Sequence, residues 1–538
     1  MNNKPNTLSI AIILSMIAAF ILGAAFKPHL DILFGHNRTL SSYKQEALFE
    51  EKIEQIIQLV EEKYVDTVSY DTLTDNLINT FLYTLDPHSH YLSSSELKAQ
   101  SEDLQGHFDG IGVSLFLYKD TICVMGFMPD SPGEKAGIQV GDRIVSVDST
   151  HTVGLTTSEI IKLIRGPRNT TVLLGVKRHG EDEIQYFTPR RDVIATPSLP
   201  YHGTIDNHIG YIRIDRFGHT TYHEFEAAIK DLLSQNIDHL ILDLRGNGGG
   251  LLDAAIRIAD EFLPQGSTIV YTEGAHAKRA VQKARRGGLY ETGDLSVLID
   301  ENSASASEVI AGALQDNDRA HIFGRRSFGK GLVQQQFPLP GNSAILLTTS
   351  RYHTPSGRCI QRSYGDGITR YYGDYIDQIL NEALSDSAMI HITDSTPYYT
   401  TSGRIVYGGG GIYPDTPLPY ITDSLLIYIN RLSNNNIIDN YAFEYITQYG
   451  TQLKKDYPTA DDFVDKFIIT NKMTEEIYQE GEKKNIQRNK ASIQKYEQHI
   501  KNIMKSRMAD ALYGNSTFYR IYIQNDNDLK RTLEIINK

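Results

Sequence analysis

A near-continuous apolar run at residues 237–244 lies near the middle of the chain and limits its fold more than any other segment. Such a run is typical of a strand buried on both faces of a parallel sheet. Strand and helix patterns alternate around it over residues 195–417: strands at 208–215, 237–244, 296–300 and 321–323, and helices at 251–262 and 307–314. This alternation predicts a layered α/β domain.

The other segments predict a multidomain protein. At 538 residues the chain is too long for one hydrophobic core, and roughly three to four domains are expected. Residues 43–104 have a helical pattern, residues 106–190 are β-rich, and residues 420–538 form a mostly helical extension.

Charge and cysteine content exclude several classes of protein. The formal net charge of −13 argues against binding to nucleic acid, which needs a basic footprint. Cys123 and Cys359 lie far apart and outside any C-x-x-C pattern, so neither a disulfide framework nor a cysteine zinc site is expected. His88 and His90 follow the breaker Asp86-Pro87, and without a third ligand this pair is interpreted as part of a turn. No metal site is therefore predicted.

Residues 8–26 are an uncharged apolar run between Lys4 and Lys27. As a helix this run would span roughly 28 Å, about the thickness of a hydrocarbon core. Residues 1–27 are therefore predicted to be a membrane anchor, or a signal peptide cleaved near Gly23-Ala24-Ala25. Either interpretation implies that the rest of the chain is exported.

Short β-rich pieces separated by glycine and proline turns occupy residues 106–190. Residues 131–148, SPGEKAGIQVGDRIVSVD, resemble the signature of PDZ domains. The segment Gly110-Ile111-Gly112-Val113 lies where that family has its carboxylate-binding loop. Glycines let successive N–H groups converge on an anion, and an exposed strand edge lets a peptide add as a strand. The resemblance implies capture of a protein C-terminus, and the alternative is a small β-domain that acts as a spacer.

The segment ENSASASE, residues 301–308, follows a predicted strand and begins a predicted helix. A serine at a helix N-terminus lies beside free N–H groups, which can stabilise an oxyanion. Ser305 and Glu308 also fit an S-x-x-E capping box, a common helix start. From these residues alone, Ser305 is either a helix cap or a nucleophile.

Two glycine-rich loops leave several chemistries open. GRRSFGKG, residues 324–331, begins as a phosphate-binding P-loop, but Gly331 replaces the required Ser or Thr and a strand pattern follows. A nucleotide site is therefore disfavoured, and Lys330 is either a solvated lysine or a base that loses its charge through desolvation. DLRGNGGG, residues 243–250, fits a phosphate cradle, a tight turn or an oxyanion donor.

Taken together, these segments resemble the C-terminal processing peptidases, or tail-specific proteases, of peptidase family S41. The resemblance rests on SASASE, on FGKG-x-VQ with its lysine 25 residues after the middle serine, and on DLR-x-NGGG upstream. Further matches lie at residues 85–89, 209–212 and 352–358. The resemblance implies an α/β protease core of the crotonase/ClpP-like layered spiral type, with a helical N-terminal region and an inserted PDZ domain.

The resemblance also implies roles for individual residues: Ser305 as nucleophile, Lys330 as general base, Gln334 as the residue that orients the lysine amine, and the N–H groups of Ala306 and Gly248 as the oxyanion hole. Gly248 is placed ahead of Gly249. Arg165, in the sequence LIRGP, matches a position that links a peptide-loaded PDZ domain to the active site in some relatives. A solvated arginine is the alternative.

The implied protein is an exported serine endopeptidase that needs no cofactor and lies in the cell envelope of a bacterium, on the periplasmic side. Its expected partners are protein substrates with free, apolar C-termini, an adaptor protein and further copies of the chain. Contact with the membrane is expected through the N-terminal segment only. Alternatives are an inactive PDZ scaffold, an acyl-CoA enzyme of the crotonase type, and a signalling protease that cuts an anti-sigma-type partner.

Overall fold

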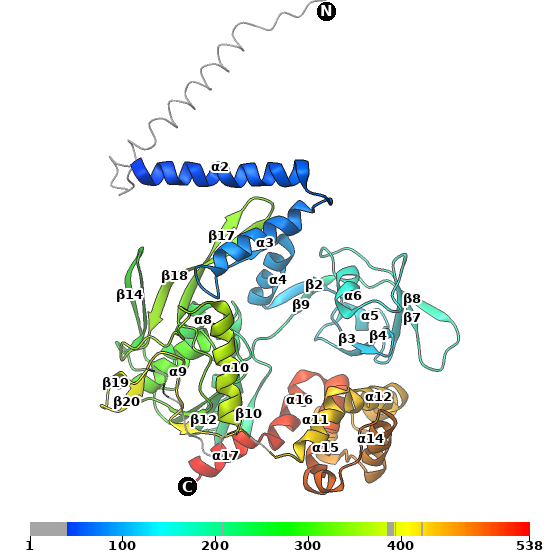
Figure 1. Cartoon of the computed structure of the whole chain (residues 1–538). Helices are drawn as coiled ribbons and strands as arrows, with labels where there is room; N and C mark the ends of the chain where they lie inside the picture. Colours follow the sequence, from blue (N-terminus) through cyan, green and yellow to red (C-terminus); the bar gives the residue numbers. More distant parts are fainter. Residues whose placement is uncertain (1–39, 207, 385–391, 393, 421–422) are drawn as a thin grey trace, which may run out of the picture. The chain divides into compact units, whose positions relative to one another are not determined.

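The computed structural model describes residues 40–206, 208–384, 392, 394–420 and 423–538. The chain divides into two compact units, residues 1–78 and 79–538 (Figure 1). The predicted membrane segment lies outside the described residues, and none of the described helices is both long and apolar enough to cross a bilayer.

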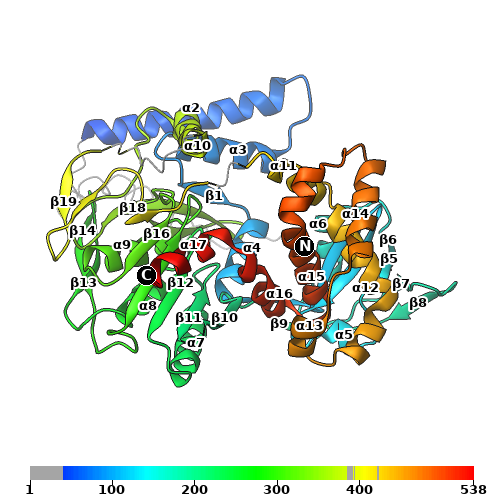
Figure 2. The ribbon, with the colours of Figure 1, turned by 90° about the horizontal axis from the view of Figure 1, so that it is seen from below.

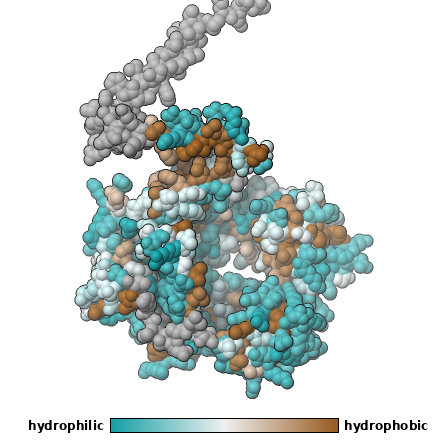
Figure 3. Space-filling model, in the orientation of Figure 1, coloured by the Kyte–Doolittle hydropathy of each residue, from teal (hydrophilic) through white to brown (hydrophobic). Residues whose placement is uncertain are grey.

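The first unit contains helix α2 (Leu40–Lys63). Helix α3 (Tyr70–Tyr83) follows and extends past residue 78, where the first unit ends. Several large apolar side chains of α2 are exposed (Figure 3), among them Leu48, Phe49, Ile56 and Leu59.

The central sheet of the second unit has the strand order β10-β11-β12-β15-β16-β21. The pair β10–β11 is antiparallel, and every later pair is parallel. The strands are β10 (Tyr201–Asp206), β11 (Ile209–Arg213), β12 (His239–Asp243), β15 (Asp294–Ile299), β16 (His321–Gly324) and β21 (Thr416–Pro417). Helices α7 (Thr221–Ser234), α8 (Leu252–Asp260) and α9 (Ala306–Asp316) alternate with these strands. The α/β prediction is confirmed.

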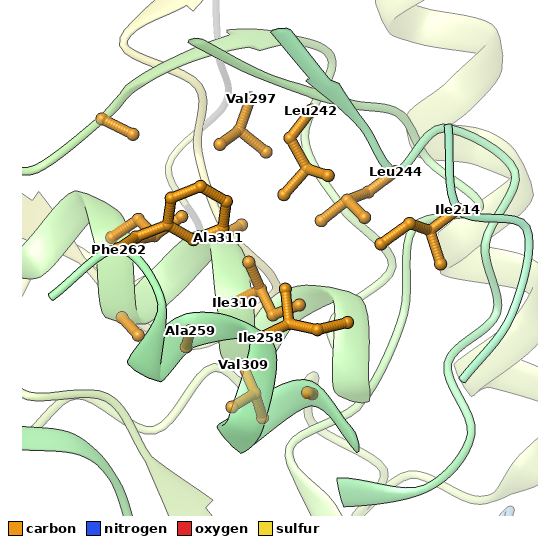
Figure 4. Packing of buried hydrophobic residues seen from close by; sticks show 14 of the residues in the cluster. Ile214, Leu242, Leu244, Ile258, Ala259, Phe262, Val297, Val309, Ile310 and Ala311 are labelled. Carbon is orange, nitrogen blue, oxygen red and sulfur yellow. The ribbon is translucent and has the colours of Figure 1, made fainter. Parts of the chain in front are cut away.

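The main hydrophobic core lies between this sheet and helices α8 and α9 (Figure 4). Leu242 and Val297 of the parallel strands are fully buried, as are Ile258 of α8 and Ile310 of α9. Burying such a side chain contributes about 1.5–3 kcal/mol. The core therefore holds the carboxyl ends of β12 and β15 rigidly, and the glycine-rich loop and Ser305 follow these ends.

A second, antiparallel sheet has the order β1-β18-β13-β14, with β17 also paired to β18. Its strands are β1 (His90–Leu92), β13 (Thr268–Gly274), β14 (Ala277–Lys283), β17 (Leu332–Leu339) and β18 (Ser343–His353). β1 precedes α4 (Ser94–Gln105), so residues 43–104 are not helical throughout. Residues 90–92 form a strand because they pair with β18, which is distant in the sequence, and a local residue pattern cannot predict such a pairing.

The PDZ region forms its own antiparallel sheet in the order β3-β4-β5-β7-β8, with β6 paired to β5. The chain enters and leaves through the pair β2 (His107–Gly110) and β9 (Asp192–Ala195). The sheet consists of β3 (Val113–Tyr118), β4 (Thr121–Phe127), β5 (Arg143–Val147), β6 (Thr150–His151), β7 (Leu174–Lys177) and β8 (Ile184–Phe187), and it is accompanied by helices α5 (Pro132–Lys135) and α6 (Thr157–Ile164). The β-rich prediction is confirmed.

The C-terminal extension is helical, as expected, and the structure shows that it has its own hydrophobic core. It contains α11 (Leu426–Asn434), α12 (Ile437–Asp456), α13 (Ala460–Lys466), α14 (Asn471–Lys483), α15 (Lys490–Tyr513), α16 (Asn515–Tyr522) and α17 (Asn527–Ile536). Residues 484–489 separate α14 from α15, and Asn485 there adopts a positive φ of 61°. Phe443 of α12 packs against Tyr118 and Cys123 of the PDZ sheet.

Candidate active site

Ser305 lies between β15 and α9, immediately before the first residue of the helix. Its φ of 54° and ψ of −112° are unusual for a residue other than glycine. Such strain persists only where the surroundings impose it, and it is frequent at functional sites. Ser305 and Glu308 form a capping box at the start of α9, in which the backbone N–H of Ser305 donates to Glu308 Oε2. The strained backbone favours a functional role for Ser305, and the capping box is present as well.

Lys330 lies in the loop between β16 and β17, and its side chain is half-buried. Its Nζ donates to Gln334 Oε1 at 2.8 Å, and Gln334 Nε2 donates to the carbonyl oxygen of His88 at 2.7 Å. Burial lowers the pKa of Lys330, while the negative charges of Asp86 and Glu308 partly oppose the shift. The expected pairing of lysine and glutamine is therefore present, although Lys330 lies ahead of the strand rather than in it.

The fully buried carboxylate of Glu308 joins the loops of Ser305 and Lys330. Its Oε2 accepts the backbone N–H groups of Ser305 at 2.8 Å and of Lys330 at 2.9 Å. Its Oε1 accepts from Gly329 N at 2.7 Å and from Ser327 Oγ at 2.6 Å. Burial raises the pKa of Glu308 despite these four donors. The residue considered as a helix cap therefore also holds together two segments more than twenty residues apart.

The DLRGNGGG loop lies beside Ser305. A Cβ on Gly249, whose φ is +106°, would be 2.8 Å from Ser305 Cβ and 3.1 Å from Ala306 N. Gly249 N–H is already donated to Asn247 Oδ1 at 2.8 Å. Within the described residues, no partner is recorded for the N–H groups of Gly248 and Ala306. This supports the placement of Gly248 ahead of Gly249 as an oxyanion donor.

The two glycines of this loop are expected to respond differently to alanine. A Cβ on Gly248 meets no atom within 4 Å, whereas one on Gly249 would also lie 2.9 Å from Ala304 O. We expect Gly249→Ala to reduce kcat by about 10²-fold, because it displaces the nucleophile, and Gly248→Ala to retain most activity. Steady-state kinetics of the two variants test this expectation, and equal losses would contradict it.

The turn at residues 86–90 belongs to this site. Asp86 accepts from His88 N, Ser89 N and Ser89 Oγ, so the interpretation as a turn agrees with the structure. Burial and the nearby Lys330 lower the pKa of His88 to about 4. The His88 imidazole is therefore neutral at pH 7, while its carbonyl group holds Gln334. Residue chemistry alone missed this role, although the LDPHS segment was among the matches to the family.

A second residue that the sequence reasoning missed is Tyr352. Its hydroxyl group lies 3.2 Å from the carbonyl oxygen of Ser305, to which it donates. Tyr352 is fully buried in β18. Its position in the matched segment 352–358 was the only signal for it in the sequence.

The predicted peptide-binding loop joins β2 to β3, and it shares no hydrogen bond with Ser305 or Lys330 among the described residues. Gly110 ends β2, Ile111 is buried in the PDZ core, and Gly112 has a φ of +70°. Val113 begins β3, an edge strand of the sheet against which α6 packs. A strand edge beside a helix is therefore available to an extended peptide.

Arg165 follows α6 and is not free in solvent. Its Nη1 donates to Glu102 Oε2 at 2.8 Å, and its guanidinium lies 4.2 Å from the ring centroid of Phe108. Glu102 belongs to α4 and Phe108 to β2, so Arg165 connects α6 to the segment through which the chain enters the PDZ sheet. Its predicted regulatory role stays a prediction.

Within the described ranges, no group of three or more His, Cys, Asp or Glu residues could hold a metal ion.

Comparison with known proteins finds similarity to one protease family. Residues 208–372 match the model of peptidase family S41, residues 124–178 match a PDZ domain, and residues 428–514 match a family of unknown function, DUF8443. The chain is 39% identical over 338 residues to the carboxy-terminal-processing protease of Bartonella bacilliformis, covering 62% of this chain and 76% of that protein. It is 34% identical over 359 residues to a probable CtpA-like serine protease of Staphylococcus epidermidis, covering 66% and 71%.

Among solved structures, the chain is similar to a photosystem II D1 C-terminal processing protease. The identity is 28%, the match covers 57% of this chain and 83% of that one, and the TM-score is 0.34.

Proposed function

Because the chain belongs to peptidase family S41 and is a serine protease of the carboxy-terminal-processing kind, we propose that it cleaves proteins with a Ser305–Lys330 dyad after its PDZ domain captures their C-termini. The observation that carries this proposal is the half-buried amine of Lys330, bound to a neutral amide and joined to Ser305 through Glu308. Partial burial, with no carboxylate bound to the amine among the described residues, favours the uncharged amine that a general base requires.

In the proposed reaction, the neutral amine of Lys330 takes the proton of Ser305 Oγ while that oxygen attacks the substrate carbonyl carbon. The peptide C–N bond then breaks, and the lysine ammonium gives its proton to the leaving amine. Water hydrolyses the resulting acyl ester, with Lys330 again acting as the base. Gln334 holds the amine in place throughout.

The oxyanion of the tetrahedral intermediate would lie between the N–H groups of Ala306 and Gly248. Ala306 N is at the start of α9, where the helix dipole favours negative charge. Donors aimed in advance at a developing charge contribute strongly in a site that excludes water.

The substrate would bind as an added strand along β3, with its carboxylate at residues 110–113. Binding of the C-terminus keeps the rest of the substrate near Ser305, so cleavage becomes effectively intramolecular. We further propose export through residues 8–26 and action on the periplasmic side of a bacterial membrane. Association with an adaptor and with further copies of the chain is part of the same proposal.

The experiment compares two forms of one unfolded protein with an apolar C-terminus, one ending in a free carboxylate and one in an amide. We expect the purified full-length chain to cleave the free form at least about tenfold faster, because the amide lacks the charge that the loop binds. Mass spectrometry of the fragments gives the rates, and a metal chelator should leave them unchanged. Equal rates would contradict C-terminal capture, and loss of cleavage with the chelator would contradict the serine–lysine mechanism.

A further inference from the structure

Three loops leave the same edge of the parallel sheet side by side. The loop after β12 carries Gly248, the segment after β15 carries Ser305, and the loop after β16 carries Lys330. β15 pairs with both β12 and β16, so these are successive strand ends. Catalysis by the proposed dyad depends on how these loops are placed relative to one another.

The first and third loops each begin with a largely buried arginine. Arg245 binds Asp243 of β12 through Nε at 2.9 Å and Nη2 at 2.6 Å. Arg325 binds Glu301, in the serine segment, through Nε at 2.8 Å. Each guanidinium is therefore fixed on one side by a carboxylate of the site's own loops.

Two carboxylates from the far C-terminus hold the other side of these arginines. Asp526 binds Arg245 in a bidentate manner, at 2.9 and 2.8 Å. Asp528 lies 2.8 Å from Arg325 and 3.5 Å from Arg245. Paired contacts of this kind are both stronger and more directional than single ones.

Asp526 and Asp528 are themselves held rigidly. Asp526 caps α17 by accepting Leu529 N–H at 2.9 Å, and Asp528 lies in the first turn of that helix. Leu529 and Ile523 pack against Leu298 and Phe323 of the central sheet. In Figure 2, α17 accordingly lies beside β12 and β16. This apolar packing of α17 on the sheet places the two carboxylates next to Arg245 and Arg325, where the active-site loops begin.

We propose that Asp526 and Asp528 are positioning residues of the protease, which fix the Gly248 loop and the Lys330 loop through Arg245 and Arg325. The proposal rests on the function proposed above and gives part of the C-terminal extension a role in it. Neither aspartate touches the reacting atoms. Without them, each arginine keeps one carboxylate partner and the two loops can shift independently.

The test uses the full chain with Asp526→Asn, Asp528→Asn and the double substitution. Glu534→Gln is the matched control, because it removes one charge from an exposed position of the same helix. We expect the double variant to lose about 10²-fold in kcat, with KM changed by less than about threefold and the fraction folded unchanged. The control should match the wild type.

Two further measurements separate positioning from mere stabilisation. The rate at which a fluorophosphonate labels Ser305 should fall in parallel with kcat, and Asp528→Glu should restore part of it. Asp528→Asn combined with Arg325→Gln should lose less than the product of the single losses, since both act through one contact.

The proposal is overturned if the double variant cleaves at the wild-type rate, or if its loss of activity equals its unfolded fraction. A wild-type chain that cleaves nothing contradicts the proposed function itself. If the wild-type chain cleaves its substrate and the double variant is equally active, only the role of the two aspartates is contradicted.

Discussion

Replacing Ser305 with alanine is expected to reduce kcat/KM for protein cleavage by about 10⁶-fold, which amounts to complete loss in an ordinary assay. The substitution removes the oxygen that would form the acyl ester, and nothing else in the described site can replace it. Stability should change by only about 1 kcal/mol, the usual cost of removing a serine from a helix cap. A thermal midpoint within a few degrees of the wild type would show that chemistry, not folding, is lost.

The neighbouring serines of the SASAS motif are the matched controls. Ser303 Oγ donates to Leu244 O at 2.8 Å, and Ser307 Oγ donates to Asn247 O at 2.8 Å. Ser303→Ala or Ser307→Ala should each cost about 1 kcal/mol of stability and retain measurable cleavage. If Ser305→Ala kept its proteolytic activity while Ser303→Ala or Ser307→Ala lost it, the nucleophile would be a different serine from Ser305.

Replacing Lys330 with methionine is expected to reduce kcat by about 10⁴-fold. Methionine has a similar length but cannot take a proton. In the wild type, activity should rise with pH as the amine loses its proton, and the lowered pKa brings this rise to a lower pH than an exposed lysine would give. The variant should show no such rise in its residual activity.

The same substitution should change stability in a pH-dependent way. The pKa of Lys330 in the folded chain lies below its ordinary value of 10.5, so at pH values between the two the unfolded chain binds the extra proton. The free energy of unfolding of the wild type therefore increases with pH across that window. The thermal midpoint of Lys330→Met should exceed that of the wild type by most at neutral pH. This difference should shrink as the pH approaches 10.5, the pKa of the lysine in the unfolded chain.

Lys505 provides the control for this experiment. Burial also lowers its pKa, and its Nζ donates to Val464 O at 2.6 Å in the C-terminal extension. Lys505→Met should leave cleavage and its pH profile unchanged. If Lys330→Met kept the wild-type pH profile, Lys330 would not be the base.

Much of the fold could be predicted because its signals are local. The apolar run at 237–244 became β12, His239–Asp243, and the helix pattern at 307–314 became α9, Ala306–Asp316. The periodicity of apolar residues predicts such elements, because the buried face of a helix or strand takes apolar residues at a fixed spacing along the chain. It missed β1, whose three residues form a strand only because β18 lies alongside.

The candidate site could be predicted as a set of residues but not as a geometry. Resemblance to the family selected Ser305, Lys330 and Gln334, whose local patterns alone also fitted a helix cap, a P-loop and a plain strand. It left Gly248 and Gly249 undecided, since both supply a backbone N–H. In the structure Asn247 Oδ1 accepts the N–H of Gly249, which favours Gly248 as the donor, and this assignment stays a prediction.

The amino-acid sequence by itself determined the elements, the PDZ and protease segments, and the residue types needed for acyl transfer, because each of these depends on short spacings along the chain. Only the tertiary structure decided which groups meet. Glu308 bridges Ser305 and Lys330, the carbonyl of His88 holds Gln334, and Asp526 reaches Arg245. These contacts join residues that are up to 281 positions apart, and the packing of sheets and helices, not spacing in the sequence, brings them together.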